Sequence, residues 1–143
     1  RQASDASTVQ RSMQMTLDQI ENLVIDTNKS ISYSVGGQAT QSDLGSQDSQ
    51  EKILILESVQ GENTQHKEIL KWNPDEKKLY CNYNSDRATD MKVMAENISA
   101  FSADISQAVS DGIVRFQITI QKKDKEMTQT YTVTLRNQLG ADS

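Results

Sequence analysis

Thiol and imidazole side chains, which often serve as nucleophile and general base, are scarce in this sequence. It has one cysteine, Cys81, and one histidine, His66. A catalytic thiolate needs a neighbouring base, and His66 lies one expected strand earlier, with no evident reason to meet Cys81. The sequence does not convincingly place a nucleophile and an orienting group around this lone histidine. We therefore expect Cys81 to be a small buried side chain, and we predict no catalytic residue, no cofactor-binding residue and no enzyme activity.

Oxygen-bearing side chains gather in one stretch. They alternate between Asn82 and Asp86, and Asp90 follows, which resembles the start of a calcium-binding loop. Arg87 stands where that loop needs glycine, and Val93 stands where it needs a closing glutamate, so solvated turn residues are the favoured interpretation. One cysteine and one histidine are too few ligands for a zinc site. No pair of carboxylates is singled out for glycosidase chemistry either. The sequence predicts no metal and no cofactor.

Three aromatic residues surround an expected turn at Pro74. Trp72 and Tyr80 flank this turn, and Tyr83 follows. A cross-strand pair or a core contact is the more common arrangement for such residues. An exposed set would instead suit a free extracellular binding module, such as an adhesin that recognises a surface ligand. We keep that module as the alternative function.

The charge balance argues against nucleic-acid binding. The formal net charge is −5, from 15 basic and 20 acidic residues, whereas nucleic-acid binders usually carry a basic stripe. The nearest candidate is the run Lys122, Lys123 and Lys125, but Asp124 and Glu126 interrupt it. We predict no direct contact with nucleic acid. No apolar run approaches the ~18 residues of a membrane span.

The length of 143 residues suits one domain. Only 35% of the residues are apolar and the mean hydropathy is −0.66, so the core should be thin. From Ser4 to about Lys29, apolar residues recur at steps of three and four, which predicts an amphipathic helix. These residues are Val9, Met13, Leu17, Ile20 and Val24. The pattern fades at its start, as expected of a helix cut in its middle.

Alternating patterns after this helix predict short strands and hairpins. The tract 38–50 is nearly all polar and should form a mobile loop, because it cannot bury enough apolar surface to offset its ordering entropy. Residues 84–90 also read as a loop, and an irregular strand should begin at about Ile98. The expected strands are 31–35, 52–58, 67–72, 78–83, 113–120 and 131–135. We predict an α+β fold in which a long N-terminal amphipathic helix packs on an antiparallel β-sheet. Residues 1–143 should form a single domain, with 1–30 as the helix and 31–143 as sheet and loops.

Several segments, taken in order, resemble a known family. The opening "RQASDASTVQRSMQMTLDQIENLVIDTNKSI" is similar to the lower half of a pilin spine helix. It is followed by "EKILILES", "EILKWNPDEKKLYC", "VMAENISAFSADIS" and "GIVRFQITIQ…YTVTLRN", which ends at Leu135, Arg136 and Asn137. The chain thus resembles the soluble domain of type IV pilin-like proteins, namely minor pilins of the PilW type and the related J pseudopilin of type II secretion.

The resemblance implies a pilin-like fold and a structural role without chemistry. It implies a minor pilin or pseudopilin that primes or caps a type IV pilus or related filament by packing against other minor and major pilins. The full-length protein would be anchored in the membrane by a preceding N-terminal helix, methylated after processing, and then assembled into an extracellular filament used, for example, in cell adhesion. The loops Gly36–Gln50 and Asn84–Asp90 would contact its neighbours. Because Cys81 has no disulfide partner, a Gram-positive source is expected.

Overall fold

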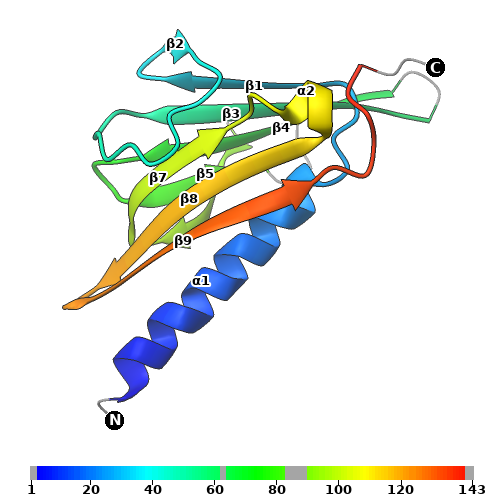
Figure 1. Cartoon of the computed structure of the whole chain (residues 1–143). Helices are drawn as coiled ribbons and strands as arrows, with labels where there is room; N and C mark the ends of the chain where they lie inside the picture. Colours follow the sequence, from blue (N-terminus) through cyan, green and yellow to red (C-terminus); the bar gives the residue numbers. More distant parts are fainter. Residues whose placement is uncertain (1–2, 62–63, 83–89, 141–143) are drawn as a thin grey trace.

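The computed structural model describes the backbone of residues 3–61, 64–82 and 90–140. Within these ranges the chain forms helix α1 (Ala3–Val24), a short helix α2 (Ala108–Asp111) and nine strands (Figure 1). The strands are β1 (Ser30–Val35), β2 (Gln38–Ala39), β3 (Lys52–Gln60), β4 (Thr64–Asn73), β5 (Lys78–Cys81), β6 (Lys92–Glu96), β7 (Ile98–Asp104), β8 (Ile113–Lys122) and β9 (Lys125–Thr134).

The predicted fold class is wrong. The strands form two antiparallel sheets, with the orders β2-β1-β3-β4-β5-β6 and β7-β8-β9, and strand residues far outnumber helical ones. The molecule is therefore mainly β, and it is not a long helix packed on a single pilin-like sheet. The expectation relied on the amphipathic helix and placed all the alternating segments that follow it in one sheet. In the structure these segments divide between two sheets.

Helix α1 is also shorter than expected, because it ends at Val24 rather than near Lys29. The following residues are drawn into contacts with β3. The side chain of Asn28 accepts a hydrogen bond from the Val59 amide at 2.8 Å and donates one to the Val59 carbonyl at 3.0 Å. The Lys29 amide donates to the Glu57 carbonyl at 3.0 Å. The chain thus turns into β1 before another helical turn can form.

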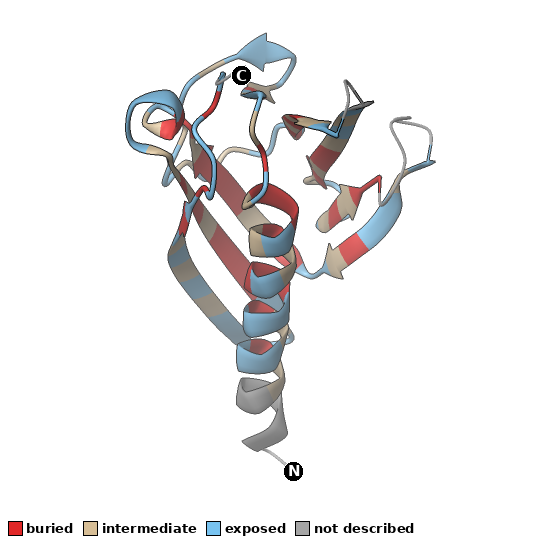
Figure 2. Ribbon diagram, turned by 90° about the vertical axis from the view of Figure 1, so that its right-hand side faces the viewer, coloured by how far each residue is buried: buried red, intermediate tan, exposed pale blue. Residues whose placement is uncertain are grey.

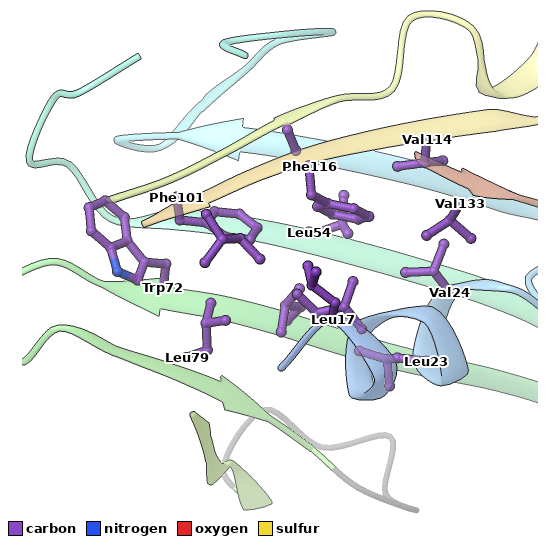
Figure 3. Close-up of a cluster of buried hydrophobic side chains, with 14 of the residues drawn as sticks. Leu17, Leu23, Val24, Leu54, Trp72, Leu79, Phe101, Val114, Phe116 and Val133 are labelled. Carbon is purple, nitrogen blue, oxygen red and sulfur yellow. The ribbon is translucent and has the colours of Figure 1, made fainter. Parts of the chain in front are cut away.

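The main core lies between the two sheets (Figure 3). Side chains alternate along β3, so that Leu54 and Leu56 are buried while Ile53 and Ile55 are partly covered on the opposite face. The register places Leu54 opposite Leu70, which continues the buried face onto β4. Other buried members from both sheets are Trp72, Leu79, Cys81, Phe101, Ala103, Val114, Phe116, Ile118 and Val133. This burial gives the fold most of its hydrophobic stabilisation.

The chain passes from one sheet to the other at Asn97. This residue has a φ of 63°, in the left-handed region where asparagine is tolerated better than most residues. It separates β6 from β7, and the amide of Ile98 donates to the Lys77 carbonyl at 2.9 Å. The sequence predicted a strand near Ile98, which is confirmed, but it missed β6.

Helix α1 packs against β8 and β9 of the smaller sheet and against β6 of the larger one. The predicted apolar stripe is confirmed, because all five of its residues are buried. Polar contacts reinforce the packing at two levels. Lys122 donates to the Ser12 hydroxyl at 3.0 Å, and the Tyr131 hydroxyl donates to the carboxylate of Glu21. The helix is thereby fixed along the β8–β9 hairpin.

Candidate functional site

The most distinctive polar cluster in the structure surrounds a buried lysine. Lys52 begins β3 on its core-facing side, and its side chain is 0% exposed. Its ammonium group donates to the Phe101 carbonyl at 2.6 Å and lies 2.7 Å from Asp43 and 3.3 Å from Asp48. It also lies 5.3 Å from the centre of the Trp72 ring, within reach of a cation–π interaction. We call Lys52, Asp43, Asp48 and Tyr33 the Lys52 cluster.

Asp43 connects this lysine to both sheets. One of its carboxylate oxygens accepts hydrogen bonds from the Tyr33 hydroxyl at 2.7 Å and from the Ala103 amide at 3.0 Å. Burial, together with the neighbouring carboxylate of Asp43, raises the pKa of Tyr33 far above its usual range. The phenol therefore remains a neutral donor. β1, β3 and β7 are thus joined through one carboxylate.

Asp48 completes the cluster from a more exposed position. Partial burial acts to raise the pKa of Asp48, but the hydrogen bond from Ser46 and the charge of Lys52 outweigh it, and the net pKa is lowered. The expected loop at 38–50 is confirmed only from Thr40 onward, and its contacts with Lys52 hold it in place. Residues 38–39 form β2, and Asp43 and Asp48 hold the remainder against the buried lysine. The composition of the segment gave no sign of an ionic anchor in the next strand.

The Lys52 cluster is a structural clamp rather than a reactive centre. Its ammonium group is fully enclosed and surrounded by acceptors, so no substrate can reach it. A lysine nucleophile must instead be accessible to its substrate. The arrangement instead fixes where the loop lies on β7, since the amide of Gly45 also donates to Ser102 Oγ at 2.9 Å.

The structure does not bring Cys81 and His66 together. Cys81 lies opposite Leu70 on β4, whereas His66 lies four residues before Leu70 on that strand, opposite Ser58. At about 3.3 Å per residue, the separation along the strand is about 13 Å. The side chain of His66 is 3.5 Å from Glu68 instead. The predicted buried role of Cys81 is confirmed, since it is 0% exposed.

We predict that the Cys81 thiol reacts with an aromatic disulfide reagent only when the protein unfolds. Burial, and secondly the charge of Glu68, raise the pKa of Cys81 to about 11, so the reactive thiolate is scarce at neutral pH. Labelling should be slow in buffer and fast in concentrated urea, as followed by absorbance. A Val109→Cys variant is the control, because that position is 71% exposed and its thiol should react at once. Comparable rates at the two thiols in buffer would contradict this prediction.

The aromatic platform of the alternative function does not form as expected. Trp72 is 2% exposed, and its indole donates to the Ile98 carbonyl at 3.0 Å. Tyr80 lies opposite Lys71 on the other face of the sheet, where its hydroxyl donates to Glu76. Tyr83 lies outside the described residues. Trp72 is thus a core residue, and it cannot share a binding surface with Tyr80.

The calcium-like stretch is described only at its two ends. Asn82 is buried and accepts a hydrogen bond from the Ile69 amide at 2.7 Å, while its amide group donates to the Lys67 carbonyl at 3.1 Å. The side chain of Asn82 therefore links the end of β5 to the backbone of β4. Residues 83–89, and with them most of the expected loop 84–90, lie outside the described residues. In the part of the chain that is described, no histidine, cysteine or carboxylate group of three or more could hold a metal ion.

Shallow depressions occur on the described part of the surface, and two of them are notable. One, of about 250 Å³, lies near the end of the β3–β4 pair where the two strands are connected, and it is lined by side chains of both charges, including Lys29, Glu57 and His66. The other, of about 210 Å³, runs between α1 and β6 and is lined by Met15, Met94, Ala95, Lys122 and their neighbours. We call the second one the α1–β6 groove. It combines apolar contact area from Met15, Met94 and Ala95 with polar and charged side chains.

Comparison with known proteins identifies no relative. The chain shows no significant match to any protein-family model, to any curated protein or to any solved structure. Among the helices that the structure describes, none combines the length and the apolar character that crossing a membrane requires. The resemblance to type IV pilin-like proteins therefore stays a prediction.

Proposed function

We propose that this chain is the globular part of a minor pilin or pseudopilin, a structural subunit that primes or caps a type IV pilus or related filament. Its partners in this proposal are other minor and major pilins. A membrane-anchoring helix precedes α1 in the full-length protein, which is held in the membrane before assembly and reaches the cell surface afterwards. The proposal assigns the chain a function of packing, without catalysis or a cofactor.

The exposed flank of α1 is the observation that carries this proposal. The N-terminal turns of α1 extend beyond both sheets (Figure 1), so a preceding helix would meet no part of the described body. On the flank away from the core, Met15 is 55% exposed and lines the α1–β6 groove. An exposed apolar side chain in a groove that also contains Met94 and Ala95 suits helix packing between subunits.

The first test is the reading frame upstream of Arg1. We expect a short basic leader, a prepilin cleavage site and ~20 apolar residues, enough to span a bilayer. A frame that starts with a methionine close to Arg1 would contradict the proposal. This test needs no folded protein, and its outcome is independent of the contacts of α1.

The second test places a charge in the groove. A Met15→Glu variant should leave the protein folded, because Met15 is exposed, but it should remove the subunit from filaments sheared off the cell surface. Immunoblotting of the sheared fraction measures this loss. Gln10→Glu is the matched control, since it adds the same charge at another exposed position on α1. Equal recovery of both variants in filaments would show that the groove is not a subunit contact.

A further inference from the structure

The two sheets have four edge strands, and three of them are protected. β2 is only two residues long, and β6 is five residues long with an irregular register against β5. The loop that contains Asp43 covers the edge of β7: the Asp43 amide donates to the Ala103 carbonyl at 3.0 Å and the Ile105 amide donates to the Gln41 carbonyl at 2.8 Å. Short length, irregularity and a covering loop are the devices by which natural proteins prevent strand addition.

The fourth edge, β9, lacks these devices. It has ten residues, contains no proline and pairs with β8 without a register shift. Figure 2 shows it as the outermost strand beside α1, banded in tan and pale blue, with its free edge directed away from the helix. An edge of this length and regularity is a ready template for another strand.

The register identifies which backbone groups of β9 face outward. The Leu135 amide donates to the Gly112 carbonyl at 2.8 Å, which extends the β8–β9 ladder by one residue. Because hydrogen-bonded and non-hydrogen-bonded pairs alternate in an antiparallel ladder, alternate residues of β9 direct their amide and carbonyl groups away from β8. These residues are Glu126, Thr128, Thr130, Thr132 and Thr134. No described residue forms a hydrogen bond with these backbone groups.

We propose that a second copy of this chain adds its own β9 to this edge, antiparallel and centred on Thr130. In that register Thr130 lies opposite Thr130 of the other copy, and Thr128 lies opposite Thr132. Every outward amide and carbonyl group then gains a partner, which no shifted register achieves. Cross-strand threonine pairs are also among the favourable ones.

The side chains suit this register on both faces. Charged residues occur only at the start of β9, and the twofold axis places Glu126 opposite Thr134, so no like charges meet across the interface. On the inner face, Met127 lies opposite Val133. The two three-stranded sheets then form one continuous six-stranded sheet. This association does not depend on the proposed role in a filament.

Solution measurements test the association. Sedimentation of the wild-type chain should show a monomer that converts to a dimer as the concentration rises. Thr130→Pro should remain monomeric, because it removes the central outward amide but no hydrogen bond to β8. Thr130→Val is the matched control and should still dimerise: both variants lose the side-chain bond from Gln117, and only proline loses the amide. Circular dichroism checks that both variants fold.

Cross-linking tests the register. Thr130→Cys should form a disulfide-linked dimer under mild oxidation, because the hydrogen-bonded pair at the axis has a Cα separation of about 5.5 Å. Thr128→Cys or Thr132→Cys alone should not, whereas a mixture of these two variants should cross-link. The native Cys81 is buried and does not compete. A monomer at every concentration, or a dimer indifferent to Thr130→Pro and without this cross-linking pattern, would overturn the proposal.

Discussion

Replacing Lys52 with alanine is expected to lower the free energy of unfolding by about 3–5 kcal/mol, the typical result of breaking a buried ion pair by removing one partner. The ammonium group lies 2.7 Å from Asp43, whose side chain is 12% exposed. Without it, this carboxylate loses its counter-charge in a largely enclosed site, and the Phe101 carbonyl loses its donor. Urea unfolding followed by circular dichroism measures the loss.

The control for Lys52 lies on the next strand. Lys71 pairs with Glu51 at 3.3 Å, but both side chains are substantially exposed, and such surface pairs contribute about 0–1 kcal/mol. Lys71→Ala should therefore change stability little. A double variant, Lys52→Met with Asp43→Asn, should recover part of the loss, because it removes both charges. Equal effects of Lys52→Ala and Lys71→Ala would show that the Lys52 cluster does not stabilise the fold.

Replacing Phe116 with alanine is expected to cost about 3–5 kcal/mol, the range for truncating a large buried aromatic side chain. Phe116 is 0% exposed, and it lies on β8 where the small sheet meets the large one (Figure 3). Its ring centre is 6.0 Å from that of Phe101, in a tilted arrangement. Truncation would leave a cavity between the sheets and remove this ring contact.

A second substitution at the same position separates cavity formation from loss of the aromatic ring. Phe116→Leu keeps most of the volume and should cost less than about half as much. The denaturant slope should be unchanged in both variants if the two sheets still unfold together. Similar losses for alanine and leucine would mean that the ring contact, rather than the filled volume, is the main stabilising interaction at this position.

These experiments bear on the proposed function, because a subunit that acts by packing needs a rigid body. The Lys52 cluster fixes the loop that covers the edge of β7, while β9 stays open. The same chain thus blocks strand addition at one edge of the small sheet and leaves the other edge available. Within the small sheet, this asymmetry leaves β9 as the edge that is open to strand addition.

Local patterns determined the elements whose residues are close in sequence. The spacing from Val9 to Val24 was sufficient to predict the buried face of α1, because helical periodicity depends only on neighbouring turns. The alternation from Ile113 to Leu135 predicted the β8–β9 hairpin, whose strands are joined by a tight turn. The burial of Cys81 was also predicted from its residue type and its strand setting.

Tertiary structure alone decided how these elements are arranged. Contacts between residues far apart in the chain decide three features: the division into two sheets, the burial of Lys52 and the position of residues 38–50. Examples are the contacts of Lys52 with Phe101 and of Asp43 with Ala103. A lysine beside four aliphatic residues carries no local sign of a buried partner. A buried charge is stable only when it is paired and hydrogen-bonded. The partners of Lys52, Asp43 and the Phe101 carbonyl, reach it only when the two sheets pack together.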